Sequence, residues 1–273
     1  MGKTLYVSDL DGTLLNKNKV ISCRSIQILN ELIDDGMAFT IATARSYHSC
    51  QKMLEPLNLA YPVILYNGAL IYDTEDKVAL HWEFFEQEEA RRYLDWIRES
   101  GISPLVYRVV DHKEQVSWQT TTAPIAAYLA SRQGDTRFFQ VASFDELYHG
   151  RIFYLTMMGT QAALSPLYRR FKDEKQIQVV FSEEIDRPGE YWLEIMPKSA
   201  SKQNGVCYLK DRYGFERVVS FGDSLNDLSL FAASDEGYAL SNAHDLLKQQ
   251  ATGIIGHHDE DGVALYLKQH WLE

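Results

Sequence analysis

Short apolar segments alternate with segments of helical periodicity in the first part of the chain. Residues 4–8 form a brief apolar, β-rich run that ends in an acidic loop containing Gly12. Beyond this loop, Ser22 can cap a helix of apolar periodicity that Gly36 can end. The expected elements are strands at residues 4–8, 38–42 and 63–66 and helices at residues 22–36 and 47–54. This alternation predicts a parallel α/β sheet whose strand ends meet along one edge, where such sheets bind ligands.

The pattern changes from about Leu80 to Arg187. We expect helices there at residues 86–100, 124–132 and 161–172, with strands at residues 103–110, 115–120, 138–141, 152–158, 177–182 and 191–195. That order predicts an α+β insertion with an antiparallel sheet. After Pro197 the alternation of helices and strands resumes. The expected fold class is therefore α/β: a Rossmann-like parallel-sheet core domain, residues 1–80 and 191–273, with an inserted α+β domain, residues 81–190.

The composition of the chain argues against several classes of function. The 273 residues carry a net charge of −11, which opposes binding to nucleic acid or to an anionic membrane because no surplus of Lys and Arg neutralises phosphates. The three cysteines are scattered and form no CxxC pair, so we expect neither a disulfide framework nor a thiolate zinc site. We also expect no leader and no membrane-spanning segment. A cytoplasmic location fits these features best.

Two aspartates stand where the first strand ends. Asp9 and Asp11 lie two residues apart, so the period of a strand directs both carboxylates to the same side. Close carboxylates repel each other unless they share a cation or a proton. A solvated turn would explain most isolated pairs of this kind. The position of this pair after a buried strand, followed by Gly12 and Thr13, favours a functional site.

Compatible residues occur at the ends of later elements. Thr43 ends the second strand and offers a hydroxyl, and Lys202 opens a helix, where its ammonium and the free backbone N–H groups both favour an anion. Asp223, Asn226 and Asp227 follow another apolar strand in the segment GDSLND. Each residue alone is more often structural. Together the loops supply a nucleophile, hard oxygen ligands for Mg²⁺, a cation and hydrogen-bond donors, which phosphoryl transfer requires.

These segments resemble the four motifs of the haloacid dehalogenase-like hydrolase superfamily: DLDGTLL, TIATARS, SASK and GDSLND. The likeness extends to the Cof-type branch through YNGALI, LEIMP, LSNA and DEDGVA, and it covers the core domain and the attachment points of the insertion. The resemblance implies that the insertion is a C2 cap, and the expected order of its elements is similar to the type B form. Substrate specificity should reside in this cap, whose own sequence matches no motif.

The resemblance implies a role for each motif residue. Asp9 attacks phosphorus, and Asp11 protonates the departing alkoxide and later deprotonates the water that hydrolyses the phosphoenzyme. Mg²⁺ binds the Asp9 carboxylate, the Asp11 backbone carbonyl and Asp223, with Asp227 in support. The phosphate oxygens are held by Thr43, Lys202, Asn226 and the backbone amides near Leu10 and Ala44. The expected reaction is hydrolysis of a small phosphorylated metabolite, such as a sugar phosphate or a phosphorylated cofactor.

Some residues depart from the motifs or carry weaker signals. Ala44 stands where many relatives have glycine, and His258 where they often have asparagine. The segment HHDED at residues 257–261 is better explained by a polar turn before a helix than by a transition-metal site. Arg45 either steers an anionic substrate or is an exposed arginine at a helix start. The cap aromatics are more often core residues than substrate contacts: Trp82, Tyr107, Trp118, Tyr191 and Trp192.

Other functions use similar residues. A phosphomutase or phosphotransferase would hand the phosphoryl group to a hydroxyl instead of water, with the same pair of aspartates. A phospho-signalling receiver gathers a comparable set, but its phosphate-accepting aspartate ends the third strand, where this chain has Tyr66 and Asn67. A non-catalytic protein that binds a phosphorylated ligand is disfavoured because every catalytic position is occupied. The sequence indicates neither the physiological substrate nor the oligomeric state.

Overall fold

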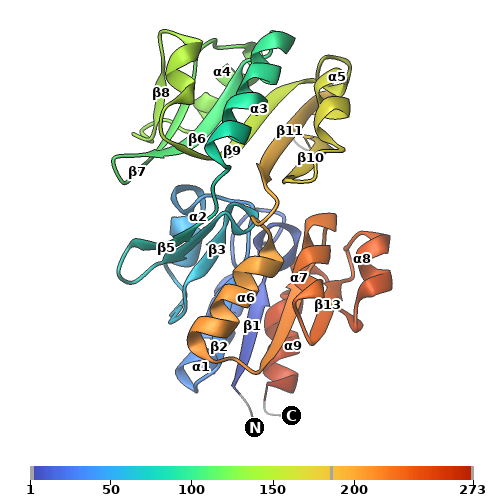
Figure 1. Cartoon of the computed structure of the whole chain (residues 1–273). Helices are drawn as coiled ribbons and strands as arrows, with labels where there is room; N and C mark the ends of the chain where they lie inside the picture. The colour runs from blue at the N-terminus through green and yellow to red at the C-terminus, as the bar shows by residue number, and fades with distance from the viewer. Residues whose placement is uncertain (1–2, 185–186, 272–273) are drawn as a thin grey trace. The chain divides into compact units, whose positions relative to one another are not determined.

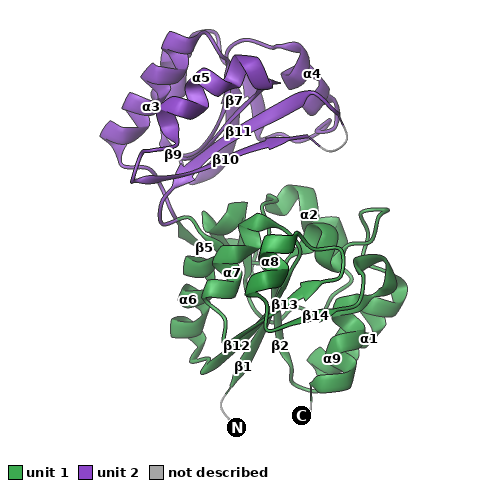
Figure 2. Cartoon of the chain, turned by 90° about the vertical axis from the view of Figure 1, so that its right-hand side faces the viewer, with its two compact units in different colours: residues 1–82, 200–273 green, residues 83–199 purple. Residues whose placement is uncertain are grey.

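The computed structural model describes residues 3–184 and 187–271 and divides them into two compact units (Figure 2). Unit 1 joins residues 3–82 to residues 200–271, and unit 2 is built from the residues between these segments. The chain thus leaves unit 1 once, forms unit 2 and returns, as the colour gradient of Figure 1 shows. The predicted fold class, a parallel-sheet core with an inserted α+β domain, is confirmed.

A parallel sheet with strand order β14-β13-β12-β1-β2 forms the centre of unit 1. Its strands are β1 (Thr4–Ser8), β2 (Ala38–Ile41), β12 (Arg217–Gly222), β13 (Glu236–Leu240) and β14 (Gly253–Ile255). Residues of β1 and β2 are buried on both faces of the sheet, which explains why these strands read as continuous apolar runs rather than as alternating ones. Because β1 pairs with both β12 and β2, the carboxyl ends of these strands meet at one edge.

Helices cover both faces of this sheet. They are α1 (Cys23–Asp34), α2 (Tyr47–Leu54), α6 (Lys202–Tyr213), α7 (Leu228–Ala232), α8 (Asp245–Gln250) and α9 (Gly262–His270). Figure 2 shows α1 with α9 on one face and α6 with α7 on the other. The start of α1 is set by Ser22, whose hydroxyl accepts a hydrogen bond from the Ser25 N–H at 3.0 Å, as the sequence predicted. Leu29 and Leu32 of α1 are buried in the core.

Unit 1 also contains an antiparallel sheet that the sequence analysis does not predict. It consists of β3 (Val63–Leu65), β4 (Leu70–Asp73) and β5 (Val78–Trp82). Residues 63–66 are expected as the third strand of the parallel sheet, yet β3 belongs to the antiparallel sheet and meets the parallel one at an isolated bridge between Ala42 and Ile64. The chain reverses at residues 66–68, where φ is 51° at Tyr66, 54° at Asn67 and 99° at Gly68, and the next strand therefore runs back antiparallel.

Unit 2 is a mostly antiparallel sheet with strand order β10-β11-β9-β6-β7-β8. Its strands are β6 (Pro104–Val110), β7 (Lys113–Trp118), β8 (Phe138–Gln140), β9 (Arg151–Thr160), β10 (Ile177–Glu183) and β11 (Glu190–Pro197). The helices α3 (Gln87–Ser100) and α5 (Gln161–Phe171) bury apolar side chains against it, and α4 (Ala123–Ala130) follows β7. Of the cap aromatics, Tyr107 and Trp118 are buried, and Tyr191 packs against the core, as expected of large aromatic residues.

The return to unit 1 comes later than the expected boundary at residue 190. β11 pairs with β9 and with β10, so residues 190–197 belong to unit 2, which extends to Ser199. The boundary differs from the expected one because a strand belongs to the unit that contains its pairing partners. The periodicity of a sequence does not show which strands pair. Within the described ranges, every helix is too short or too polar to cross a membrane.

Candidate active site

Asp9 follows β1 directly, at the carboxyl edge of the parallel sheet, and is only 4% exposed. The chain then closes a tight turn, η1 (Leu10–Leu14), in which the Leu15 N–H donates to the Leu10 carbonyl at 2.8 Å. Gly12 makes this turn possible, because its φ is +73° and a Cβ at this position would lie 2.2 Å from Oδ2 of Asp223. The acidic loop after β1 therefore passes directly over the acidic loop after β12.

Lys202 joins residues from three distant parts of the chain. It opens α6, and its ammonium donates to Oδ1 of Asp9 at 2.6 Å and to Oδ1 of Asp227 at 2.7 Å. Lys202 and Asp227 are even less exposed than Asp9, at 1% and 0%. A charge buried this deeply is strongly destabilising unless it is paired and hydrogen-bonded. The three positions are therefore mutually dependent, and the structure brings these predicted residues into direct contact.

Asp227 also holds the second acidic loop in place. Its Oδ2 accepts the backbone N–H groups of Asp223 and Ser224, each at 3.0 Å. Asp223 in turn accepts a hydrogen bond from the Thr13 hydroxyl at 3.1 Å, which ties the two acidic loops together. Asp227 thus orients both the loop that carries Asp223 and the ammonium of Lys202.

Negative charge exceeds positive charge in this group. Carboxylate oxygens of Asp9, Asp223 and Asp227 lie within 4.8 Å of one another, and one ammonium, that of Lys202, bonds to two of these residues. Burial raises the pKa of Asp9 well above its usual range, although Lys202 lowers it. Burial and the nearby Asp227 carboxylate raise the pKa of Asp223 to about 6. Burial lowers the pKa of Lys202, but the carboxylates of Asp227 and Asp9 outweigh burial and raise it.

The same residues fit a divalent cation. When all three carboxylates are ionised, they exceed the single ammonium by two negative charges, which is the charge that such a cation would neutralise. Carboxylate oxygens are the ligands that hard cations such as Mg²⁺ prefer. Burial is the main cause of the raised pKa of Asp223, and the Asp227 carboxylate adds to it, whereas the Thr13 hydroxyl and the Lys202 ammonium lower it.

Asp11 has different surroundings from Asp9. Its two oxygens accept hydrogen bonds from Arg45, Oδ2 from Nε and Oδ1 from Nη2, both at 2.6 Å. The Asp11 side chain is 50% exposed, whereas Asp9 is buried. The expectation that both carboxylates point to the same side assumed that the strand continues, but η1 begins at Leu10. The structure also assigns Arg45 a partner that the sequence analysis did not consider.

The remaining predicted phosphate-binding residues lie at the ends of neighbouring elements. Thr43 follows β2 and is 1% exposed, and its hydroxyl accepts the Arg45 N–H at 3.2 Å. The Leu10 side chain is buried in η1, and Ala44 is exposed. Asn226 lies in the loop after β12, where its Nδ2 donates to Oδ1 of Asn67 at 3.3 Å. Among the described residues, none of these four side chains bonds directly to Asp9.

Two asparagines that the sequence analysis did not assign connect the loops. Asn67, in the left-handed conformation after β3, is the partner of Asn226. Asn242, after β13, donates to the Gly12 carbonyl at 2.8 Å and accepts the His258 N–H at 3.2 Å. Both residues belong to segments quoted for the Cof-type resemblance, YNGALI and LSNA. The motifs contain both asparagines, but the sequence does not show which loop each asparagine side chain contacts.

Comparison with known proteins identifies the family of this chain. A family model of haloacid dehalogenase-like hydrolases matches residues 6–267, which include both units. The chain belongs to the haloacid dehalogenase-like hydrolases. The resemblance to this superfamily and to its Cof-type phosphatase branch is therefore confirmed.

Similar proteins of this family are named as phosphatases. A Bacillus subtilis (strain 168) protein, 5-amino-6-(5-phospho-D-ribitylamino)uracil phosphatase YwtE, is 29% identical over 96% of each chain. The pyridoxal phosphate phosphatase YbhA of Escherichia coli (strain K12) is 27% identical over 97% of each chain. The crystal structure of a haloacid dehalogenase-like hydrolase from Bacteroides thetaiotaomicron shares the fold, with a TM-score of 0.81 and 24% identity over 97% of this chain and 98% of that one.

This hydrolase is accordingly a phosphoric monoester hydrolase, and a receiver domain or a non-catalytic binding protein is not supported. Phosphatases of this superfamily generally use a metal ion. The carboxylate group around Asp9 is one of two groups of described residues that could hold such an ion.

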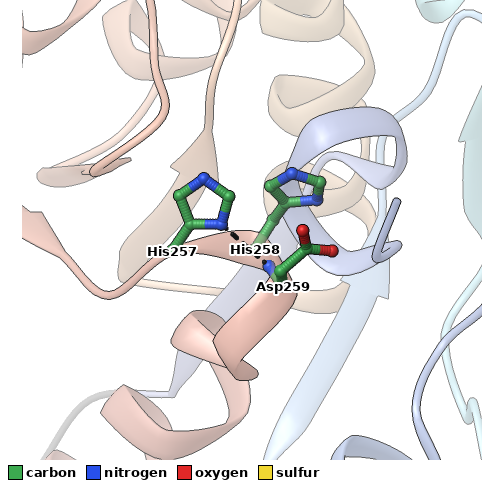
Figure 3. A group of neighbouring side chains, drawn as sticks. All are labelled: His257, His258 and Asp259. Carbon is green, nitrogen blue, oxygen red and sulfur yellow. Dashed lines mark hydrogen bonds between the residues drawn. The ribbon is translucent and has the colours of Figure 1, made fainter. Parts of the chain in front are cut away.

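A second group of possible metal ligands in this hydrolase lies at the turn before α9. Figure 3 shows His257, His258 and Asp259, whose potential ligand atoms lie within 4.8 Å of one another. Nδ1 of His257 already accepts the Asp259 N–H at 3.1 Å, and Nδ1 of His258 lies 2.8 Å from the Leu15 carbonyl. These bonds favour the interpretation of a polar turn. They also attach this turn to the loop that follows Asp9.

A cavity of about 700 Å³ in unit 1 lies apart from the carboxylate group. It is formed by α2 and by β4 with the turn that follows it, and it includes Tyr47 and Tyr72, whose rings lie 4.4 Å apart. Its lining contains none of the predicted catalytic, phosphate-binding or metal-binding residues. The candidate site is therefore defined by its buried charges and not by the size of a cavity.

Proposed function

We propose that this hydrolase is a Mg²⁺-dependent phosphatase that cleaves a small phosphorylated metabolite through an aspartyl-phosphate on Asp9. The observation that carries the proposal is the buried contact of Lys202 with Asp9 and Asp227 beside Asp223. It gathers a nucleophile, a cation and a set of hard oxygen ligands at one sheet edge. A structural ion pair alone would not require an additional carboxylate.

In the first half-reaction, a carboxylate oxygen of Asp9 attacks phosphorus. The bond between phosphorus and the alkoxide oxygen breaks, and Asp11 gives its proton to that oxygen. Lys202 already contacts Asp9, so it can offset the negative charge that the incoming phosphate brings into a buried site. The hydroxyl of Thr43, the amide of Asn226 and the backbone N–H groups near Leu10 and Ala44 are the donors proposed for the phosphate oxygens.

In the second half-reaction, a water molecule attacks the phosphorus of the aspartyl-phosphate. Asp11, now a carboxylate, takes the proton of this water, and the bond between phosphorus and the Asp9 oxygen breaks. Phosphate leaves and Asp9 is free again. Asp9, Asp223 and the backbone carbonyl of Asp11 would hold Mg²⁺, which when bound supplies the positive charge that lets an anionic nucleophile approach an anionic ester.

The names of the relatives indicate which compounds to test first. The B. subtilis relative is named for a phosphorylated ribitylaminouracil and the E. coli relative for pyridoxal phosphate. Both compounds join a phosphate to a nitrogen heterocycle, so phosphorylated heterocycles and sugar phosphates form the natural panel. We propose a cytoplasmic location for this reaction, since Cys23, Cys50 and Cys207 are free.

The test compares the wild type with Asp9→Asn on this panel, with Mg²⁺ and after removal of metal by a chelator. We expect hydrolysis to need Mg²⁺ and Asp9→Asn to lose at least about 10³-fold in kcat. Asp145→Asn is a matched control, because Asp145 is an exposed residue of unit 2. Metal-independent hydrolysis, or full activity of Asp9→Asn, would contradict the proposal. Adding an acceptor alcohol distinguishes hydrolysis from transfer, since a phosphotransferase would form a new ester.

A further inference from the structure

The pairing of Arg45 with Asp11 is unusually well defined for a pair at the protein surface. Two guanidinium nitrogens contact two different carboxylate oxygens, both at 2.6 Å, which is the geometry of a bidentate pair. Arg45 itself is fixed on both sides of its backbone: its N–H donates to the Thr43 hydroxyl at 3.2 Å, and its carbonyl accepts the Tyr66 N–H at 3.1 Å. Arg45 therefore has a set position from which to hold Asp11.

Stability is a poor explanation for this pair. The side chains of Arg45 and Asp11 are 21% and 50% exposed, and exposed pairs contribute little because water solvates both partners. Within the part of the chain that the structure describes, Arg45 supplies every hydrogen bond that the Asp11 carboxylate accepts. The orientation of the Asp11 carboxylate thus depends on one side chain.

We propose that Arg45 is a positioning residue that holds the Asp11 carboxylate ready to take the proton of the water that hydrolyses the phosphoenzyme. This inference rests on the proposed function. In the observed pair, both Asp11 oxygens act as acceptors, and only a carboxylate can accept a proton from water. In the first half-reaction, by contrast, one Asp11 oxygen must carry a proton and donate it, and that form cannot keep both hydrogen bonds to Arg45.

In the step that Arg45 assists, the bond that forms at phosphorus replaces the one that breaks. A water oxygen bonds to phosphorus, the bond between phosphorus and the Asp9 oxygen breaks, and one water proton moves to an Asp11 oxygen. The electron pair of the broken bond stays on Asp9 as its carboxylate. Arg45 exchanges no proton and no electron in this step, and it acts only through the orientation of Asp11.

Arg45→Met tests the inference, because it removes the guanidinium and keeps much of the side-chain length. We expect the steady-state rate to fall by about 10²-fold, since removing an aligned general base costs this order of magnitude. We also expect a larger fraction of the enzyme to be trapped as phosphoenzyme after rapid acid quenching, because formation of the intermediate outpaces its hydrolysis. The kcat values for p-nitrophenyl phosphate and for an alkyl phosphate should converge, since both substrates form the same intermediate.

Two further variants control the experiment. Arg24→Met makes the same change on the exposed surface of α1 and should behave as the wild type. Arg45→Lys keeps one charge and should recover part of the rate with less trapped intermediate, while thermal unfolding of all variants stays close to that of the wild type.

A lower rate of Arg45→Met without more phosphoenzyme would overturn the inference, because Arg45 would then act on substrate binding or on the first half-reaction. Unchanged kinetics would overturn it as well. The absence of any phosphoenzyme on Asp9 in the wild type is a separate result, and it would reject the proposed function itself.

Discussion

Both units of this hydrolase bury charged side chains, but these charges have different partners. In unit 1, Lys202 bonds to Asp9 and to Asp227, so a buried cation meets carboxylates from distant parts of the chain. In unit 2, Arg108 is 3% exposed and donates to neutral acceptors, namely the carbonyls of Glu146 and His149 and the hydroxyl of Ser117. The group in unit 1 has more carboxylates than cations, whereas Arg108 in unit 2 holds a loop against the sheet.

This difference distinguishes a buried charge of the candidate active site from a buried charge that bonds to neutral groups of the fold. A cation such as Arg108 satisfies the backbone carbonyls of a loop, although its own Nε is buried without a hydrogen-bond partner among the described residues. A group of carboxylates with too few cations is an expensive arrangement for a protein to keep. A bound cation would supply the missing charge.

Replacing Lys202 should produce the largest effect on activity. Lys202→Met leaves Asp9 and Asp227 without their shared cation, and we expect kcat/KM to fall by about 10³-fold because both the nucleophile and the phosphate lose this charge. Steady-state kinetics measure the effect. Lys198→Met is the matched control on the exposed surface of unit 2 and should retain activity. Comparable losses in the two variants would mean that the buried group has no special role.

Replacing Arg108 should affect stability instead of chemistry. Arg108→Met leaves the Glu146 and His149 carbonyls without their donor, and we expect the free energy of unfolding to fall by about 3 kcal/mol. Urea denaturation measures this loss, and kcat and KM of the remaining folded enzyme should match the wild type. A large fall in kcat with little change in the free energy of unfolding would contradict this expectation, because Arg108 would then contribute to catalysis and not to stability.

A substitution at Gly12 tests whether activity requires the close approach of the two acidic loops. Gly12→Ala places a methyl group 2.2 Å from Oδ2 of Asp223 and also forces alanine to a φ of +73°. Gly36→Ala is the matched control, because Gly36 has a φ of +101° and nothing within 4 Å of the added Cβ. We expect Gly36→Ala to lose only about 1 kcal/mol of stability, and Gly12→Ala to lose about 2 kcal/mol and most of the activity. Equal behaviour of the two variants would show that the approach of the loops is unimportant.

Glu194 of β11 should give unit 2 a smaller pH dependence. Burial raises its pKa from 4.5 to about 7, against the effect of the hydrogen bond from the Tyr154 hydroxyl. Between these two values the folded state keeps a proton that the unfolded state has lost, so stability should decrease as pH rises from about 5 to about 7. The expected change is on the order of 1 kcal/mol. Urea denaturation across this range should show the slope in the wild type and a flatter profile in Glu194→Gln.

The sequence predicted the residues of the buried group because each marks the end or start of an apolar element. Asp9 and Asp223 follow buried strands, and Lys202 opens a helix, so the order of strands in a parallel sheet is enough to bring them to one edge. The same logic predicted the fold class. It required no knowledge of side-chain conformation.

Contacts between loops could not be predicted in the same way. The bond between Arg45 and Asp11 and the bond between Asn67 and Asn226 depend on rotamers and on local turns. The reversal between β3 and β4 does not follow from the hydrophobic pattern, because it depends on positive φ at Tyr66 and Asn67. The boundary near residue 190 was misplaced because β11 finds its partners, β9 and β10, in unit 2.

The most direct test of the account is to trap the intermediate. The enzyme is mixed with a phosphorylated substrate and Mg²⁺ and quenched in acid within the first turnover, and its peptides are mapped by mass spectrometry. We expect one phosphoryl group, carried by the peptide of the loop after β1 and located on Asp9. A fully active enzyme that never carries this group, or carries it on another residue, would contradict the claim that Asp9 is the nucleophile.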